Sequence, residues 1–231
     1  MKPAFWARKA HKWIGLLIGI QALLWMASGL YMTSISIDVI HGDHLAHVEH
    51  APLDRSKLAV TPEALALRFP AMQGFKLKWF LGRQVYEVRH PGGIALVDAA
   101  DARVISPLPE ATIRKAAVGL YQGKAPIESV SLLREAPQEV GGRPVPMWQV
   151  HFADRGGTSL YLSPQSGELL AKRHSLWRWF DFLWMLHIMD YETRENVNNT
   201  LLRVATIVCL GFALSGAWLL FYSFNRRRSA R

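Results

Sequence analysis

Nine histidines are the side chains of this 231-residue sequence best suited to chemistry, and six of them lie in or beside two long apolar stretches. A neutral imidazole nitrogen can ligate a metal ion, either free or held in a porphyrin. An ionisable side chain at membrane depth is costly and commonly functional. We therefore take as candidates His11 at the start of the first stretch, His187 ahead of the second, and a group between them, His41, His44, His47 and His50.

His11 is followed at i+4 and i+8 by Gly15 and Gly19, which share its helix face. Small residues on this face would let a second helix or a flat ligand approach the backbone closely, and Gly211 and Ser215 offer a matching face on the second apolar stretch. Helix packing alone explains the glycines equally well, and a histidine here could simply contact lipid headgroups and water.

His187 follows an aromatic run that is typical of a helix at a membrane–water boundary. Met185 and Met189 flank it, so the side chain lies on an apolar helix. From chemistry alone, a ligand and an ordinary core histidine are equally good readings. The run comprises Trp177, Trp179, Phe180, Phe182 and Trp184.

The four histidines from His41 to His50 recur every third residue, so neighbours on a continuing helix would be rotated by about 60°. Two or three of them would then share a face. A metal site using His41, His44 and His47 is one interpretation, and a solvated polar stalk is another. The other histidines, His90, His151 and His174, are interpreted as structural or surface groups.

Two long apolar stretches must position these side chains, and they predict transmembrane helices at 13–37 and 197–224, the first uncharged and the second charged only at Arg203. All 18 acidic residues lie between Asp38 and Glu195, whereas Lys and Arg flank the outer ends of both stretches. Since Lys and Arg stay on the cytoplasmic side, we expect an inner-membrane protein with both termini cytoplasmic and the middle exported. A cleaved signal peptide is the competing reading of the first stretch.

Several function classes are excluded by composition and motif. The pI near 9.9 reflects the charged termini rather than a nucleic-acid-binding surface, because no basic stripe with interleaved aromatics is present. Cys209 is the only cysteine, so no disulfide framework can form. No glycine-rich nucleotide fingerprint follows a strand, which leaves no visible NAD or flavin site.

The exported segment is predicted as one α+β unit repeated, each copy a helix followed by an antiparallel sheet. The first copy has a helix at 62–69, and the second has a helix at 110–121. Pro91-Gly92-Gly93 and Arg155-Gly156-Gly157 occupy equivalent hairpin turns. Strands are expected at 75–81, 84–89, 94–97 and 104–105 in the first copy and at 127–133, 147–152, 159–162 and 168–172 in the second.

The expected fold class is thus an α+β membrane protein with two transmembrane helices flanking two helix-plus-sheet repeats. Its predicted segments are a cytoplasmic N-terminus at 1–12, transmembrane helices at 13–37 and 197–224, a histidine-rich stalk at 38–58, repeats at 59–107 and 108–174, an interfacial aromatic helix at 175–196 and a basic tail at 225–231.

Across essentially its whole length, the sequence resembles the PepSY-associated transmembrane family. The resemblance rests on His11-Lys12-Trp13-Ile14-Gly15, Leu186-His187, Ser163-Pro164-Gln165-Ser166-Gly167-Glu168 and Ser215-Gly216-Ala217-Trp218. It implies a periplasmic PepSY module on a bacterial inner membrane. Larger members are similar to haem-containing reductases of ferric siderophores with four spans, so a chain with two spans implies a homodimer.

For the site, the resemblance favours haem b as cofactor, with His11, His187 and His44 as ligands to its iron and Gly15 and Gly19 beside it. His11 from two subunits would hold one haem, and His187 would hold another with His44 or a symmetry mate. Electrons from a quinol or a protein would reach a periplasmic acceptor such as a ferric siderophore, which would make the protein an oxidoreductase.

Two alternatives from other classes stay open. The protein could be a non-enzymatic, membrane-anchored PepSY module whose strands bind a partner protein or peptide. It could instead bind copper or iron through the segment from His41 to His50. A lipid bilayer is an expected partner in every case, and nucleic acid in none.

Overall fold

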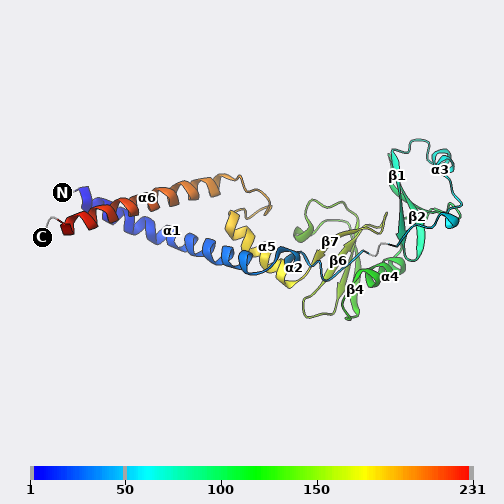
Figure 1. Cartoon of the computed structure of the whole chain (residues 1–231), viewed down its shortest axis with the longest axis horizontal. Coiled ribbons are helices and arrows are strands. Elements are labelled where there is room, and N and C mark those ends of the chain that lie inside the picture. The colour runs from blue at the N-terminus through cyan, green and yellow to red at the C-terminus, as the bar shows by residue number, and fades with distance from the viewer. Residues whose placement is uncertain (1–2, 49–50, 229–231) are drawn as a thin grey trace. The chain divides into compact units, whose positions relative to one another are not determined.

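The protein is described by a computed structural model covering residues 3–48 and 51–228 (Figure 1). The chain divides into two compact units. The first, called the helical unit here, contains the residues up to Ser36 together with those from Trp179 onward. The second, the sheet unit, is Ile37–Arg178. Each unit is described by itself.

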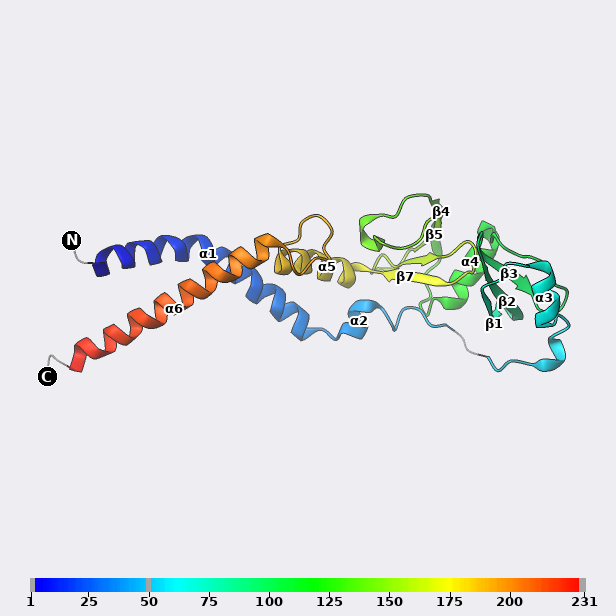
Figure 2. The same ribbon diagram turned by 90° about the horizontal axis from the view of Figure 1, so that it is seen from above.

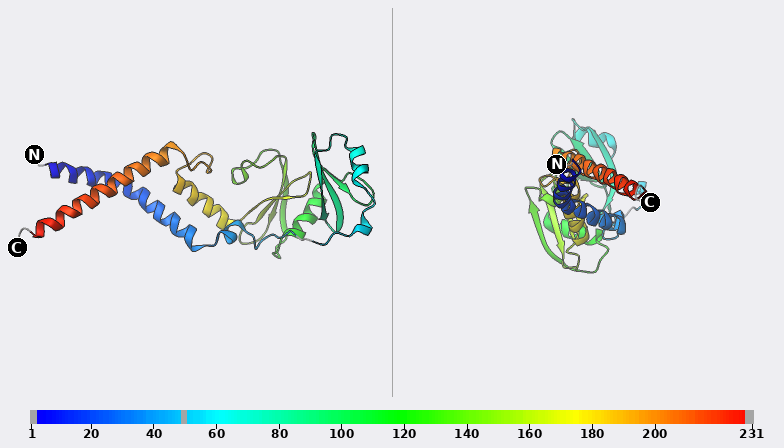
Figure 3. Two further views of the ribbon diagram at one scale, coloured as in Figure 1. Left: turned by 45° about the horizontal axis from the view of Figure 1, so that its top comes forward. Right: turned by 90° about the vertical axis from the view of Figure 1, so that its left-hand side faces the viewer.

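The helical unit is built from α1 (Pro3–Ser34), the last part of α5 (Ser175–Ile188) and α6 (Thr200–Arg228). Within α1 and α6, His11–Ser34 and Thr200–Leu220 are long and apolar enough to cross a membrane. Their side chains are largely exposed, as expected of helices that face lipid. Figure 3 shows α1 and α6 crossing one another, and no third long helix accompanies them in the described part of the unit.

The helix boundaries differ from the sequence prediction at several points. Helix α1 begins before the predicted span 13–37, at Pro3, and ends at Ser34. Helix α6 begins at Thr200 because Asn199 caps it, its Oδ1 accepting a hydrogen bond from Leu202 N at 2.8 Å. The interfacial helix predicted at 175–196 ends at Ile188, after which Met189 adopts a positive φ of 54°.

The first repeat of the sheet unit consists of α3 (Pro62–Arg68) and an antiparallel sheet of β1 (Gly74–Phe80), β2 (Arg83–His90) and β3 (Gly93–Asp98). Thr61 caps α3 through Oγ1, which accepts from Ala64 N at 3.3 Å. The strand predicted at 104–105 is reduced to a single bridge between Val97 and Val104.

The second repeat consists of α4 (Glu110–Leu120) and four antiparallel strands in sequential order. They are β4 (Ile127–Leu133), β5 (Met147–Phe152), β6 (Ser159–Leu162) and β7 (Leu169–Arg173). The α+β class and the two antiparallel sheets are therefore confirmed.

Helix α4 lies between the two sheets, which joins the repeats into one core (Figure 2). Its buried Ile113 and Ala117 share a hydrophobic cluster with Leu96 of β3 and Leu160 of β6. Alternate strand residues face away from α4, as strand geometry requires. Tyr86 and Val88 pack with Leu65 of α3, and Tyr161 packs beside Val140 of the short 3-10 helix Gln138–Val140.

The segment 38–58 was predicted as a stalk, yet its described residues belong to the sheet unit and pack against it. Helix α2 (Ile37–His41) is followed by Gly42 with a φ of +71°, so the helix does not continue through the later histidines. Ala46 then forms a bridge with Tyr121, and His47 N donates to Leu120 O at 2.9 Å. A short 3-10 helix (Arg55–Lys57) completes the segment.

Candidate ligand histidines in the helical unit

His11 is held on α1 by residues of α6. Its Nδ1 lies 2.7 Å from Ser215 Oγ, and its ring stacks on Phe212 with 4.1 Å between centroids and 15° between planes. The next residue of α6, Gly216, leaves room for the imidazole, since a Cβ there would lie 3.4 Å from His11 Cε1. The ring therefore has a defined position and a defined plane.

The hydrogen bonds of Ser215 favour one tautomer of His11. Ser215 Oγ donates its proton to Phe212 O at 2.8 Å, so towards the imidazole it acts as an acceptor. In a neutral imidazole this arrangement favours the proton on Nδ1 and the lone pair on Nε2. A hydrogen bond at one ring nitrogen that leaves the other unprotonated is the usual arrangement around a metal-ligating histidine.

His187 has the same arrangement with partners from different elements. Its Nδ1 lies 2.8 Å from Oγ of Ser28, a fully buried residue of α1. Ser28 Oγ donates to Leu24 O at 2.7 Å and so accepts from Nδ1. The ring of Trp184, one helical turn earlier on α5, is parallel to the imidazole within 9°, with 6.4 Å between centroids.

The end of α5 that carries His187 is fixed by side chains of α1 and by the residue before α6. The last carbonyls of a helix lack partners within the helix. Here Trp25 Nε1 donates to His187 O at 2.8 Å and Gln21 Nε2 donates to Leu186 O at 3.3 Å. Asn199 Nδ2 donates to Ile188 O at 2.8 Å. The Leu186-His187 pair is thus anchored through its backbone as well as its imidazole.

The two histidines occupy separate positions along the helix pair. His11 and Ser28 belong to one continuous helix, and at 1.5 Å per residue they are about 25 Å apart along its axis. This separation is comparable with the hydrocarbon thickness of a bilayer, about 30 Å. The structure therefore places one imidazole near each end of the candidate spans.

The glycines near His11 differ in whether they contact the neighbouring helix. A Cβ on Gly15 would meet the Phe212 ring at 2.9 Å, so Gly15 serves the close contact of α1 with α6. Neither Gly19 nor Gly211 has any described atom within 4 Å of such a Cβ. The smooth face predicted from the sequence is thus used for helix packing at Gly15 and is open at Gly19.

The remaining histidines lie in the sheet unit. His41, His44 and His47 are exposed, and His44 faces the ring edge of His174 with 6.0 Å between centroids. The described residues contain no group of three or more His, Cys, Asp or Glu arranged to hold a metal ion, so these three are not brought together. His50 lies outside the described residues.

The three histidines that the sequence assigned to structural or surface roles have local partners. Burial lowers the pKa of His174, whose Nε2 lies 3.1 Å from Ile40 O. His90 accepts from Gly92 N at 3.1 Å, and His151 Nδ1 lies 3.0 Å from Ser159 Oγ.

Sequence reasoning missed four residues that orient the candidate ligands: Gln21, Trp25, Ser28 and Phe212. Ser215, Gly216 and Trp184 were named from the sequence beforehand. A polar residue such as Gln21 within an uncharged span is a signal that could have found one of them, because it needs an internal partner in lipid.

Two antiparallel sheet repeats encoded between two apolar helices of membrane-spanning length fit a membrane protein with an α+β domain. The family model described as PepSY-associated TM region matches residues 8–231, and the chain belongs to this family. No curated protein and no solved structure matches the chain.

Proposed function

We propose that this protein binds haem b in the bacterial inner membrane and passes electrons across it to a periplasmic acceptor such as a ferric siderophore. One observation supports this above others. Both candidates in the helical unit, His11 and His187, have Nδ1 hydrogen-bonded to a serine whose own proton is used elsewhere, which leaves Nε2 able to ligate iron.

The donor set of the chain fits this cofactor. Neutral imidazole is an established axial ligand of haem iron, and an aromatic ring lies nearly parallel to each imidazole, with Gly216 beside His11. The described helical unit supplies one histidine at each position. A symmetric homodimer would supply the second, because two-fold symmetry presents the same residue twice.

The two positions are proposed as separate binding sites. His11 and its symmetry mate would serve the cytoplasmic side, following the Lys and Arg at both ends of the chain. His187 would serve the outer side, with its symmetry mate as the second ligand. Bound haem would supply one-electron transfer between these sites.

The chain's own groups have definite tasks in this proposal. Ser215 and Ser28 hold the proton on Nδ1 and keep Nε2 deprotonated. Phe212 and Trp184 fix the planes of the two imidazoles. Electrons would come from a quinol or another protein, and reduction of a ferric chelate would make the protein an oxidoreductase.

A second candidate function is a membrane-anchored binding module that needs no cofactor. The pocket in the sheet unit described below favours it. Metal binding by the segment from His41 to His50 has no comparable support, since its described histidines are exposed and not gathered.

The test is an absorption spectrum of the purified full-length protein before and after dithionite, with haem quantified per chain. We expect a low-spin b-type spectrum that loses part of its amplitude in His11→Ala and in His187→Ala. His151→Ala, which removes a histidine of the sheet unit, is the matched control. A colourless protein from haem-sufficient cells, or a folded double variant with full haem, would refute the proposal.

A further inference from the structure

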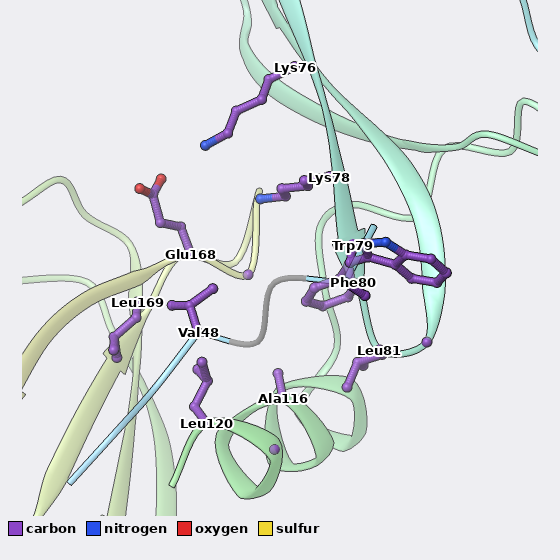
Figure 4. Close-up of a pocket in the computed structure, with 14 residues that line it drawn as sticks. Val48, Lys76, Lys78, Trp79, Phe80, Leu81, Ala116, Leu120, Glu168 and Leu169 are labelled. Carbon is purple, nitrogen blue, oxygen red and sulfur yellow. The ribbon is translucent and has the colours of Figure 1, made fainter. Parts of the chain in front are cut away.

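A pocket of about 520 Å³ opens in the sheet unit where the two repeats meet. Strand β1 forms one wall, α4 another, and the start of β7 the third (Figure 4). This volume falls within the range of about 300–1,000 Å³ that is common for small-molecule sites. All of its lining residues belong to the same compact unit.

One end of the pocket is apolar. Phe80 and Leu81 at the end of β1 lie near Ala116 and Leu120 of α4, with Val48 and Leu169 beside them (Figure 4). Several of these side chains are only half-buried, so covering them would remove apolar surface from water.

The other end carries charges, which Figure 4 shows as Lys76, Lys78 and Glu168 on one side of the pocket. Lys76, Lys78 and Phe80 alternate along β1 and therefore share the face that lines the cavity. The strand thus presents two ammonium groups next to an aromatic ring.

Lys78 is already neutralised within the fold. Its Nζ donates to Glu87 Oε2 at 2.5 Å and to Ser166 O at 2.9 Å, and the Lys78–Glu87 pair is mostly buried. Glu87 stands directly opposite Lys76 in the β1–β2 register, yet its carboxylate is taken by Lys78. Among residues 3–48 and 51–228, Lys76 therefore has no ion-pair partner.

Glu168 is the matching uncompensated anion. Its side chain is exposed, and neither Glu168 nor Lys76 forms an ion pair within residues 3–48 and 51–228. A ligand with only a carboxylate would satisfy Lys76 and meet repulsion from Glu168. A ligand with only an ammonium group would pair with Glu168 and be repelled by Lys76.

We infer that this pocket binds a small zwitterion with an apolar body, of the class of apolar amino acids and dipeptides. Lys76 receives the carboxylate, Glu168 receives the ammonium group, and the apolar end between β1 and α4 receives the side chains. This site does not depend on the proposed haem function.

The experiment uses the full-length protein in lipid nanodiscs and isothermal titration calorimetry. Its probe is the dipeptide L-leucyl-L-phenylalanine, compared with its N-acetylated, C-amidated and doubly capped forms. We expect the zwitterion to bind about tenfold more tightly than either singly capped form, since each cap removes one charge-assisted hydrogen bond.

Two charge variants assign the roles. Lys76→Ala should weaken binding of the zwitterion about tenfold. In this variant the zwitterion and the C-amidated form should bind with equal affinity. In Glu168→Gln the zwitterion and the N-acetylated form should bind with equal affinity. Neither residue belongs to the hydrophobic core, so both variants should fold.

A third variant blocks the cavity without threatening the fold. Gly119 lines the pocket on α4, and a Cβ there meets nothing within 4 Å. Gly119→Leu should prevent binding while favouring the helix, because leucine has the higher helix propensity. Val118→Leu changes the exposed neighbouring residue of α4 and is the matched control.

Equal affinity for the zwitterion and the doubly capped peptide would overturn the assignment, as would tighter binding of a singly charged form. Absence of binding by all four peptides would also overturn it. Unchanged binding in Gly119→Leu would mean that the ligand binds outside this pocket, which would also overturn the assignment.

Discussion

His187 and Ser28 lie 159 residues apart in sequence and 2.8 Å apart in space, between Nδ1 and Oγ. The contact ties the end of α5 to the buried face of α1. Because Ser28 donates to the Leu24 carbonyl, the serine also favours the imidazole tautomer with its proton on Nδ1. His11 and Ser215 repeat the relationship between α1 and α6.

Removing the Ser28 hydroxyl should therefore weaken haem binding at the outer site. In Ser28→Ala the Nδ1 proton loses its acceptor, and loss of such an orienting partner commonly costs about 10–100-fold in metal affinity. Haem titration of the reconstituted protein measures the effect. Thr33→Ala is the control, since Thr33 donates only to carbonyls of its own helix. A folded Ser28→Ala protein with unchanged affinity would contradict this role.

Gly15 and Gly19 should respond differently to alanine. At Gly15 the new Cβ would meet the Phe212 ring at 2.9 Å and force the α1–α6 contact to shift, which costs about 1–3 kcal/mol when packing is tight. At Gly19 the Cβ enters open space, so Gly19→Ala should leave the free energy of unfolding unchanged or slightly higher. Unfolding in detergent mixtures, followed by circular dichroism, compares the two. Equal losses would show that the crossing does not depend on Gly15.

Asp190 should organise the loop between α5 and α6. Its carboxylate accepts from the Thr193 hydroxyl at 2.6 Å and from the backbone N–H groups of Asn196 at 2.9 Å and Glu195 at 3.0 Å. The Thr193 hydrogen bond is the largest cause that holds the pKa of Asp190 far below its usual range. In Asp190→Ala these N–H groups lose their acceptor, and we expect their hydrogen exchange to accelerate about tenfold.

Mass spectrometry of peptides covering 189–199 measures that exchange. Asn198→Ala alters an exposed residue of the same loop and should leave the exchange unchanged. Slow exchange in Asp190→Ala would mean that the loop is held by other contacts.

Glu139 should make the sheet unit sensitive to acid. Burial by itself would raise the pKa of Glu139, but hydrogen bonds from Arg178 and Tyr161 outweigh it, so the pKa is lowered from 4.5. A carboxylate whose pKa is lowered by folding stabilises the fold above its unfolded pKa. That contribution is present at neutral pH and lost as the pH falls below 4.5 towards the folded value.

We expect Glu139→Gln to be about 1–3 kcal/mol less stable at neutral pH, because Arg178 loses its charged partner. Its stability should also fall less steeply than that of the wild type below pH 4.5. Thermal unfolding across this range measures both effects. Glu135→Gln is the control, because Glu135 is exposed and makes no ion pair among the described residues. Parallel pH profiles for Glu139→Gln and the wild type would refute the assignment.

Local sequence pattern predicted most elements because it acts within a few residues. Alternation and turn residues located β4, β5 and β6 at their observed bounds, and Thr61-Pro62 located the start of α3. The sequence could not show that the histidine segment leaves the helix at Gly42 and pairs with the end of α4. That outcome depends on the bridge from Ala46 to Tyr121, a contact between distant parts of the chain.

The sequence by itself determined the two apolar helices, the repeated α+β pattern and the choice of His11 and His187, because hydropathy, periodicity and residue chemistry are written along the chain. Only the tertiary structure decided how those histidines are held. Ser28, Trp25 and Phe212 have no local signal that links them to an imidazole, and their hydrogen bonds and ring contacts exist only once α1, α5 and α6 pack together.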